Sequence, residues 1–144
     1  MNDDTKAVIR FLEALQSYRT KLGELRTELI QRGAKNASVA FNLGVPFRVH
    51  KANSLSSTLS GTVSLGVEVA PRTGAPRHFE ITIRWDAETW YIDTEIWQDD
   101  RFQNQHLLHA FPQRSTSSLD ECLSDIDAAI DDLRASAEFA EAVA

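Results

Sequence analysis

The chain has 144 residues, a formal net charge of −6 and 42% hydrophobic residues, which is typical of a soluble globular domain. The negative charge disfavours binding to nucleic acid or to an anionic membrane surface, because both select a basic face. No apolar run approaches the ~20 residues that cross a bilayer, and the acidic N-terminal segment lacks the pattern of a signal peptide. The single cysteine, Cys122, fits a reducing compartment. We therefore expect one cytoplasmic domain over residues 1–144, with a surface suited to a basic partner.

The N-terminal segment predicts a long amphipathic helix from Asp4 to Arg32. Its apolar residues recur at steps of three and four, namely Val8, Phe11, Leu15, Tyr18, Leu22, Leu25 and Leu29. Gly33 is placed to end the helix in a left-handed conformation. Ile9, Leu12 and Ile30 widen the apolar stripe, which predicts more than one neighbour. Such a helix is about 43 Å long, whereas a domain of this size is about 37 Å across, so an overhanging stripe would suit a homodimer through this helix.

Strand patterns of period two follow the helix. Pro46 cannot donate a ladder hydrogen bond, so the first strand is expected at an edge of the sheet or with a bulge near Pro46. A proline-rich turn at 71–76 and a tight connection at Asp86–Thr89 separate the later strands, and Gln105–Phe111 is a shorter fifth candidate. The residues predicted to face inward are Val39, Phe41, Leu43, Val45, Phe47 and Val49, then Leu59, Val63, Leu65, Val67 and Val69, then Phe79, Ile81, Ile83 and Trp85, and finally Trp90, Ile92, Thr94 and Ile96.

A second helical pattern, from Leu119 to Ala140, closes the chain. Ser118 and Glu121 have capping-box spacing at its start, and the final segment EFAEAVA lacks a stop signal and should fray. Short connections favour antiparallel neighbours, and a sheet that is apolar on one face needs cover on that face only. The predicted fold class is α+β, with a long N-terminal helix, a four- to five-stranded antiparallel meander and a C-terminal helix, both helices lying on one sheet face.

No pattern of residues indicates catalysis. His106 and His109 have H-x-x-H spacing, but on a strand they point to opposite faces, and spacing fixes no third ligand. Cys122 lies in a helix seam with no histidine placed beside it. Asp93 and Glu95 share a strand face, where adjacent carboxylates usually form solvated surface. We therefore predict that the protein is not an enzyme and uses no cofactor or metal.

The fourth strand predicts a contact surface on the sheet face that the helices leave open. Exposed aromatic residues among acids suit a protein partner, because aromatics anchor interfaces and charges steer the approach. The alternative is that Tyr91 and Trp97 lie under the neighbouring loop or the fifth strand. The predicted protein-binding residues, named here the acidic–aromatic patch, are Tyr91, Asp93, Glu95, Trp97, Asp99 and Asp100.

The segments ITIRW (81–85) and TWYIDTEIW (89–97), in a meander between two helices, give the chain its resemblance to a known family. It resembles the small helix–meander–helix immunity proteins of bacterial polymorphic toxin systems. The resemblance implies one-to-one inhibition of a cognate toxin that is encoded nearby, and assigns no residue a role. An acidic chaperone for a secreted effector is the alternative, although such chaperones usually interrupt the strands with a helix. A small-ligand domain or enzyme would place polar residues at inward positions, where Thr94 stands alone.

Overall fold

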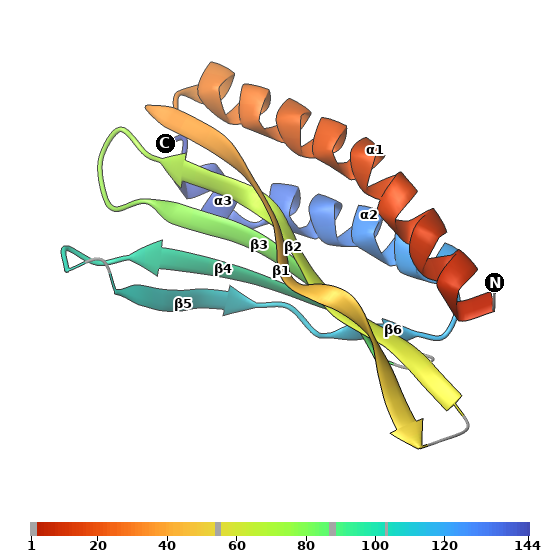
Figure 1. Ribbon diagram of the computed structural model, residues 1–144. Helices are drawn as coiled ribbons and strands as arrows, with labels where there is room; N and C mark the ends of the chain where they lie inside the picture. Colours follow the sequence, from red (N-terminus) through yellow and green to blue (C-terminus); the bar gives the residue numbers. More distant parts are fainter. Residues whose placement is uncertain (1–2, 54–55, 87–88, 103) are drawn as a thin grey trace.

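The computed structural model describes residues 3–53, 56–86, 89–102 and 104–144, with the side chains of 3–5 and 43–60 left outside the description. A long helix comes first, a set of antiparallel strands follows, and two helices end the chain (Figure 1). The elements are α1 (Asp3–Arg32), β1 (Asn36–Asn53), β2 (Ser56–Ala70), β3 (Arg77–Asp86), β4 (Thr89–Asp99), β5 (Gln105–Ala110), β6 (Arg114–Thr116), α2 (Leu119–Ala135) and α3 (Ala137–Glu141).

The sheet is an antiparallel meander in the order β1-β2-β3-β4-β5, and both long helices lie on one of its faces (Figure 1). The predicted fold class is confirmed. A sixth strand, β6, was not predicted, because three residues are too short to show a period of two. β6 pairs with the first part of β4 and β5 pairs with the last part, so the two short strands follow one another along the same edge.

The core lies between the helices and the covered face of the sheet. The helix seam predicted from Val8 to Leu29 is buried, as are the inward residues of β3 and β4 and those of β2 from Val63 onward. At one end of the core, the Trp90 ring lies 4.8 Å from the Phe11 ring and 5.3 Å from the Trp85 ring, measured between centroids. Thr94 is the one buried polar residue among those described. Burial on this scale contributes roughly 1.5–3 kcal/mol for each large apolar side chain.

Two predictions about apolar surface are wrong. Phe41 of β1 is 37% exposed, because an edge strand has a neighbour on one side only. Ile9, Leu12 and Ile30 of α1 are each 39% exposed and therefore do not widen the buried seam. The expectation that α1 has more than one neighbour is nevertheless confirmed, because the helix packs on the sheet and on α2. The inward side chains predicted at Leu43, Val45, Phe47, Val49 and Leu59 lie outside the described residues.

The prediction for Pro46 is confirmed in both of its forms. β1 lies at one edge of the sheet, and its register with β2 shifts between Leu43 and Val45 and again between Val45 and Arg48. Gly33 ends α1 with a φ of 123°, as predicted.

The reason given for a homodimer does not hold, since the seam is buried within the chain along its whole length. The homodimer itself stays a prediction.

The C-terminal helix differs from its prediction. Ser136 has extended backbone (φ −71°, ψ 151°) and ends α2, and its hydroxyl accepts a hydrogen bond from the Phe139 amide to start α3. The resulting turn brings Phe139 onto Phe79, with ring centroids 5.6 Å apart and edge-to-face geometry. Phe139 is fully buried and Ala142 is 2% exposed, so the expected fraying of this segment is wrong. Phe139 of α3 is therefore part of the core.

The capping box at the start of α2 forms only in part. The Ser118 hydroxyl accepts from the Glu121 amide at 3.4 Å, as the spacing predicts. The Glu121 carboxylate instead accepts from the Thr116 hydroxyl at 2.6 Å, and the same hydroxyl accepts from the Ser118 amide. Thr116, rather than Glu121, therefore accepts from the Ser118 amide, and it ties β6 to α2.

Candidate functional site

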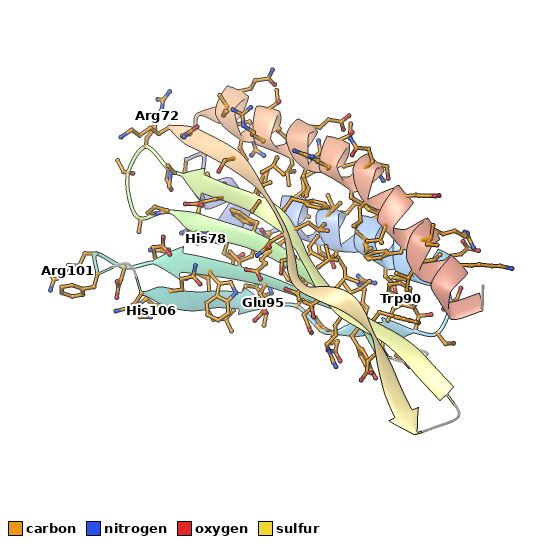
Figure 2. All side chains as sticks on the ribbon, in the orientation of Figure 1. Arg72, His78, Trp90, Glu95, Arg101 and His106 are labelled. Atoms are coloured by element: carbon orange, nitrogen blue, oxygen red, sulfur yellow. The ribbon has the colours of Figure 1, made fainter. Side chains whose placement is uncertain are left out.

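The sheet face opposite the helices, named here the uncovered face, holds the β4 residues of the acidic–aromatic patch, of which Glu95 is labelled in Figure 2. Along β3 and β4, buried residues alternate with half-buried or exposed ones, so every second side chain points away from the core. Strand pairing then fixes which residues share this face. They are Thr62, Ser64, Gly66 and Glu68 on β2, His78, Glu80, Thr82 and Arg84 on β3, and Tyr91, Asp93, Glu95 and Trp97 on β4.

The two predicted aromatic anchors are half-buried, and both touch neighbouring strands. Trp97 is paired with Leu107 of β5, whose side chain is 48% exposed. The Arg84 guanidinium lies over the Tyr91 ring, 4.3 Å from its centroid, which is a cation–π contact. Trp97 and Leu107 thus form an apolar area at one end of the patch, while Tyr91 already has a partner within the chain.

Asp99 and Asp100 are held by hydrogen bonds within the chain. Asp99 lies 3.0 Å from the His78 ring nitrogen Nε2. Asp100 accepts from the amides of Phe102 and Asn104, at 2.8 and 2.9 Å, and contacts His106 at 3.0 Å. The hydrogen bond to His106, followed by those from the backbone, lowers the pKa of Asp100. Asp100 therefore organises the connection between β4 and β5, in which Phe102 is 68% exposed, whereas Asp99 ties β4 to β3.

The centre of the uncovered face carries three neighbouring carboxylates. Glu95 lies directly opposite Glu80 of β3, and Asp93 shares its strand face. Burial raises the pKa of Glu95, and the negative charges of Glu80 and Asp93 raise it further. Asp93 accepts from the side-chain amide of Gln113 at 2.9 Å and Glu80 accepts from the Thr82 hydroxyl at 3.2 Å, whereas the Glu95 carboxylate has no hydrogen-bond partner among the described residues. Like charges directly opposite one another destabilise a sheet, so a cation from outside would relieve this cluster.

Sequence reasoning did not identify Glu80, although the signal was present. If the connection at Asp86–Thr89 is tight, counting back from it pairs each β3 residue with a β4 residue, and Glu80 then meets Glu95. It also did not identify Leu107 and Gln113, whose neighbours depend on a bulge in β5 and on the path of the chain after it. No local pattern predicts either of these.

The remaining candidates for chemistry do not form a site. Burial and the nearby Asp125 raise the pKa of the Cys122 thiol to about 12, so it is not a thiolate at neutral pH. His106 contacts Asp100, while His109 faces the helices and lies 3.3 Å from Glu138. Within the described part of the chain, no three metal-ligating side chains come together.

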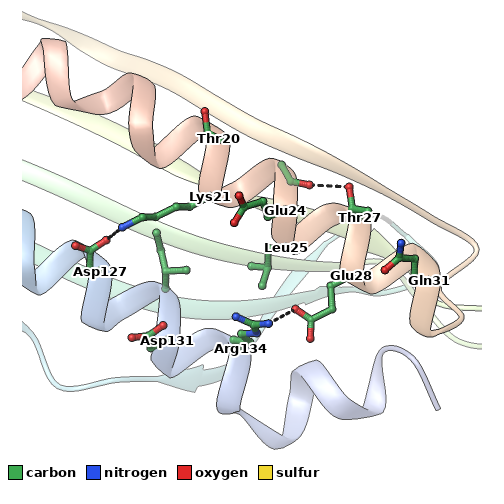
Figure 3. A pocket seen from close by; sticks show the side chains of 12 residues that line it. Thr20, Lys21, Glu24, Leu25, Thr27, Glu28, Gln31, Asp127, Asp131 and Arg134 are labelled. Atoms are coloured by element: carbon green, nitrogen blue, oxygen red, sulfur yellow. Dashed lines mark hydrogen bonds and ion pairs between the residues drawn. The ribbon is translucent and has the colours of Figure 1, made fainter.

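A groove of about 750 Å³ separates α1 from α2 on the opposite side of the molecule (Figure 3). Leu25 and Ile130 line it, and both of its basic side chains already have acidic partners. Lys21 pairs with Asp127 across the groove, and Arg134 pairs with Glu28 at 2.9 Å. These ion pairs join the two helices, so the groove is explained by helix packing.

Comparisons with protein-family models, curated proteins and solved structures found no match for the chain. Over the described residues, no helix is both long enough and apolar enough to cross a membrane. What distinguishes the molecule is the contrast on the uncovered face, where a row of carboxylates adjoins the apolar area of Trp97 and Leu107.

Proposed function

We propose that this chain is a non-enzymatic inhibitor that binds another protein through the uncovered face of its sheet. In its most specific form, it is an immunity protein that neutralises a cognate bacterial toxin in the cytoplasm by occluding it. The observation that carries the proposal is the cluster of Glu80, Asp93 and Glu95 beside the half-buried Trp97. A surface of this kind has a cost in self-repulsion that a basic partner would remove.

The charge balance of the uncovered face supports a basic partner. Among the described side chains, its carboxylates include Glu68, Glu80, Asp93, Glu95 and Asp99, and its one described arginine, Arg84, is engaged with Tyr91. Complementary charges accelerate association and reject acidic competitors. The nucleic-acid cleft of a nuclease toxin is such a surface, since it must present lysine and arginine to phosphates.

The apolar end of the patch supports a protein rather than a small cation. Leu107 and Leu108 of β5 are 48% and 39% exposed, and Phe102 at the adjacent tip is 68% exposed. A few residues supply most of the binding free energy of an interface, and tryptophan is enriched among them. Trp97, next to Leu107, is placed to act as such an anchor.

The proposal is tested by expressing each gene that flanks this one, alone and together with the chain, in a bacterial host. We expect one flanking product to stop growth and this chain to restore it. Trp97→Ala should raise the Kd of the purified complex by roughly 30-fold, as for a hot spot of ~2 kcal/mol. The double variant Asp93→Lys, Glu95→Lys should lower the association rate and its salt dependence, because steering by exposed charges is screened by salt beyond ~10 Å.

The matched control reverses charge on the opposite side of the molecule. Glu24→Lys with Asp131→Lys changes the same formal charge in the groove between the helices, and should leave protection and Kd unchanged. The proposal is rejected if neither flanking product is toxic. It is also rejected if the variants of the patch and of the groove protect equally well.

A further inference from the structure

A recess of about 230 Å³ opens on the uncovered face between β1, β2 and β3, next to the acidic cluster. It is smaller than the ~300–1,000 Å³ of a typical small-molecule site, and at ~30 Å³ per water it holds several waters. This is the size of one long side chain rather than of a cofactor. The residues that matter most in its lining are Ala40, Gly66, Glu68, His78 and Glu80.

Gly66 forms the recess because no side chain fits there. A Cβ atom at this position would lie 1.9 Å from the Phe79 carbonyl oxygen, so the pairing of β2 with β3 requires glycine. On the other side of Gly66, its partner in β1 is Ala40, whose side chain is a single methyl group. Two small residues side by side leave a hollow in a face whose other positions carry larger side chains.

Acidic side chains line the recess. Glu80 is the partner of Gly66 in the strand register, and Glu68 is the partner of His78, so the two glutamates are diagonal neighbours on adjacent strands. Such positions are about 7–8 Å apart. No lysine or arginine of the described chain lines the recess. His78 is bonded to Asp99 at 3.0 Å and lies 4.0 Å from Glu68, which fixes the ring at the wall.

We propose that this recess receives one arginine side chain from the protein partner. The inference rests on the proposed function and names the chemistry by which that partner is anchored. A guanidinium is planar and carries five donors in a fixed fork, so it can reach both Glu68 and Glu80, whereas an ammonium is a compact point charge. Glu80 also faces Glu95 across β3 and β4, so a guanidinium here lowers the repulsion at the centre of the patch.

The test is an NMR titration of the isotope-labelled full chain with the capped tripeptide Gly-Arg-Gly. We expect saturable shifts of the Gly66 and Glu80 amide signals with a millimolar Kd. The matched peptide with citrulline, which has the same shape without the charge, should produce none. Glu80→Gln should weaken binding by about tenfold, the effect of one charge-assisted hydrogen bond. Glu24→Gln, in the groove between the helices, is the control and should have no effect.

Other outcomes overturn the inference. The arginine site is rejected if the two peptides shift the same signals equally, or if the shifts map to the groove between the helices. It is also rejected if the corresponding lysine peptide binds as tightly as the arginine peptide. A failure of this titration together with a loss of protection by Trp97→Ala would leave the inhibitor proposal standing. Saturable arginine binding together with a failed growth assay would keep the arginine site and reject the inhibitor proposal.

Discussion

The two faces of the sheet are built from the same strands and differ by one residue in the sequence. On the covered face, Leu65, Ile81 and Thr94 form one row across β2, β3 and β4. On the uncovered face, the next residues along form the row Gly66, Glu80 and Glu95. The first row is buried under two helices, and the second combines a hollow with two facing carboxylates. The comparison teaches that one face is packed for stability, while the other carries facing carboxylates that lower stability, which our proposal assigns to the binding of a partner.

The largest expected difference compares two tryptophans on β4. Trp90 is 2% exposed and packs on Phe11 and Trp85, so Trp90→Ala should cost about 3–5 kcal/mol of unfolding free energy. Trp97 is half-buried beside Leu107, so Trp97→Ala should cost roughly 0.2–1 kcal/mol, the value of a cross-strand pair. Urea unfolding of both variants measures this. Equal urea midpoints would contradict this prediction, because they would mean that Trp90 and Trp97 contribute equally to the unfolding free energy.

Gly66 should be an exception on the uncovered face, because it is required by backbone contact. Gly66→Ala should destabilise the protein by about 1–3 kcal/mol, since the added Cβ collides with the Phe79 carbonyl. Gly23 of α1 is the matched control, where a Cβ would meet nothing within 4 Å. Gly23→Ala should stabilise by about 0.5–1 kcal/mol through helix propensity. Thermal or urea unfolding distinguishes the two, and a neutral Gly66→Ala would contradict the close approach of β2 and β3.

The smallest expected effect concerns Glu95 and its dependence on pH. Its pKa in the folded state is raised above the ordinary value of 4.5, so the folded protein binds more protons than the unfolded chain just above that pH. Stability from this group therefore falls as the pH rises through the raised pKa. Glu95→Gln should be more stable than the native chain at pH 7, by roughly 0.2–1 kcal/mol, and the difference should vanish below pH 4.5.

The control for this prediction is Glu13→Gln, a change at an exposed glutamate of α1. It removes the same formal charge at a position that is remote from Glu80 and Glu95. A profile that shifts equally in both variants would show that net charge, rather than the opposition of Glu80 and Glu95, is responsible.

The sequence by itself determined the order of the elements and the faces of the central strands. The seam from Val8 to Leu29 and the alternation in β3 and β4 are local periodicities, and local periodicity specifies which side of an element is buried. It also predicted that Tyr91, Asp93, Glu95 and Trp97 share one strand face, with Asp99 and Asp100 continuing from it. What it could not supply is which residues on other strands lie beside them.

Tertiary structure decided the features that depend on a neighbour. Phe41, Ile9 and Leu12 have the apolar character of core residues, yet they are exposed: Phe41 lies on the edge strand β1, and Ile9 and Leu12 lie outside the buried seam of α1. Phe139 has the opposite outcome, since the turn at Ser136 carries it onto Phe79. The meeting of Glu80 with Glu95, and the recess over Gly66, arise from strand register, which is set by pairing between segments rather than by the pattern within any one of them.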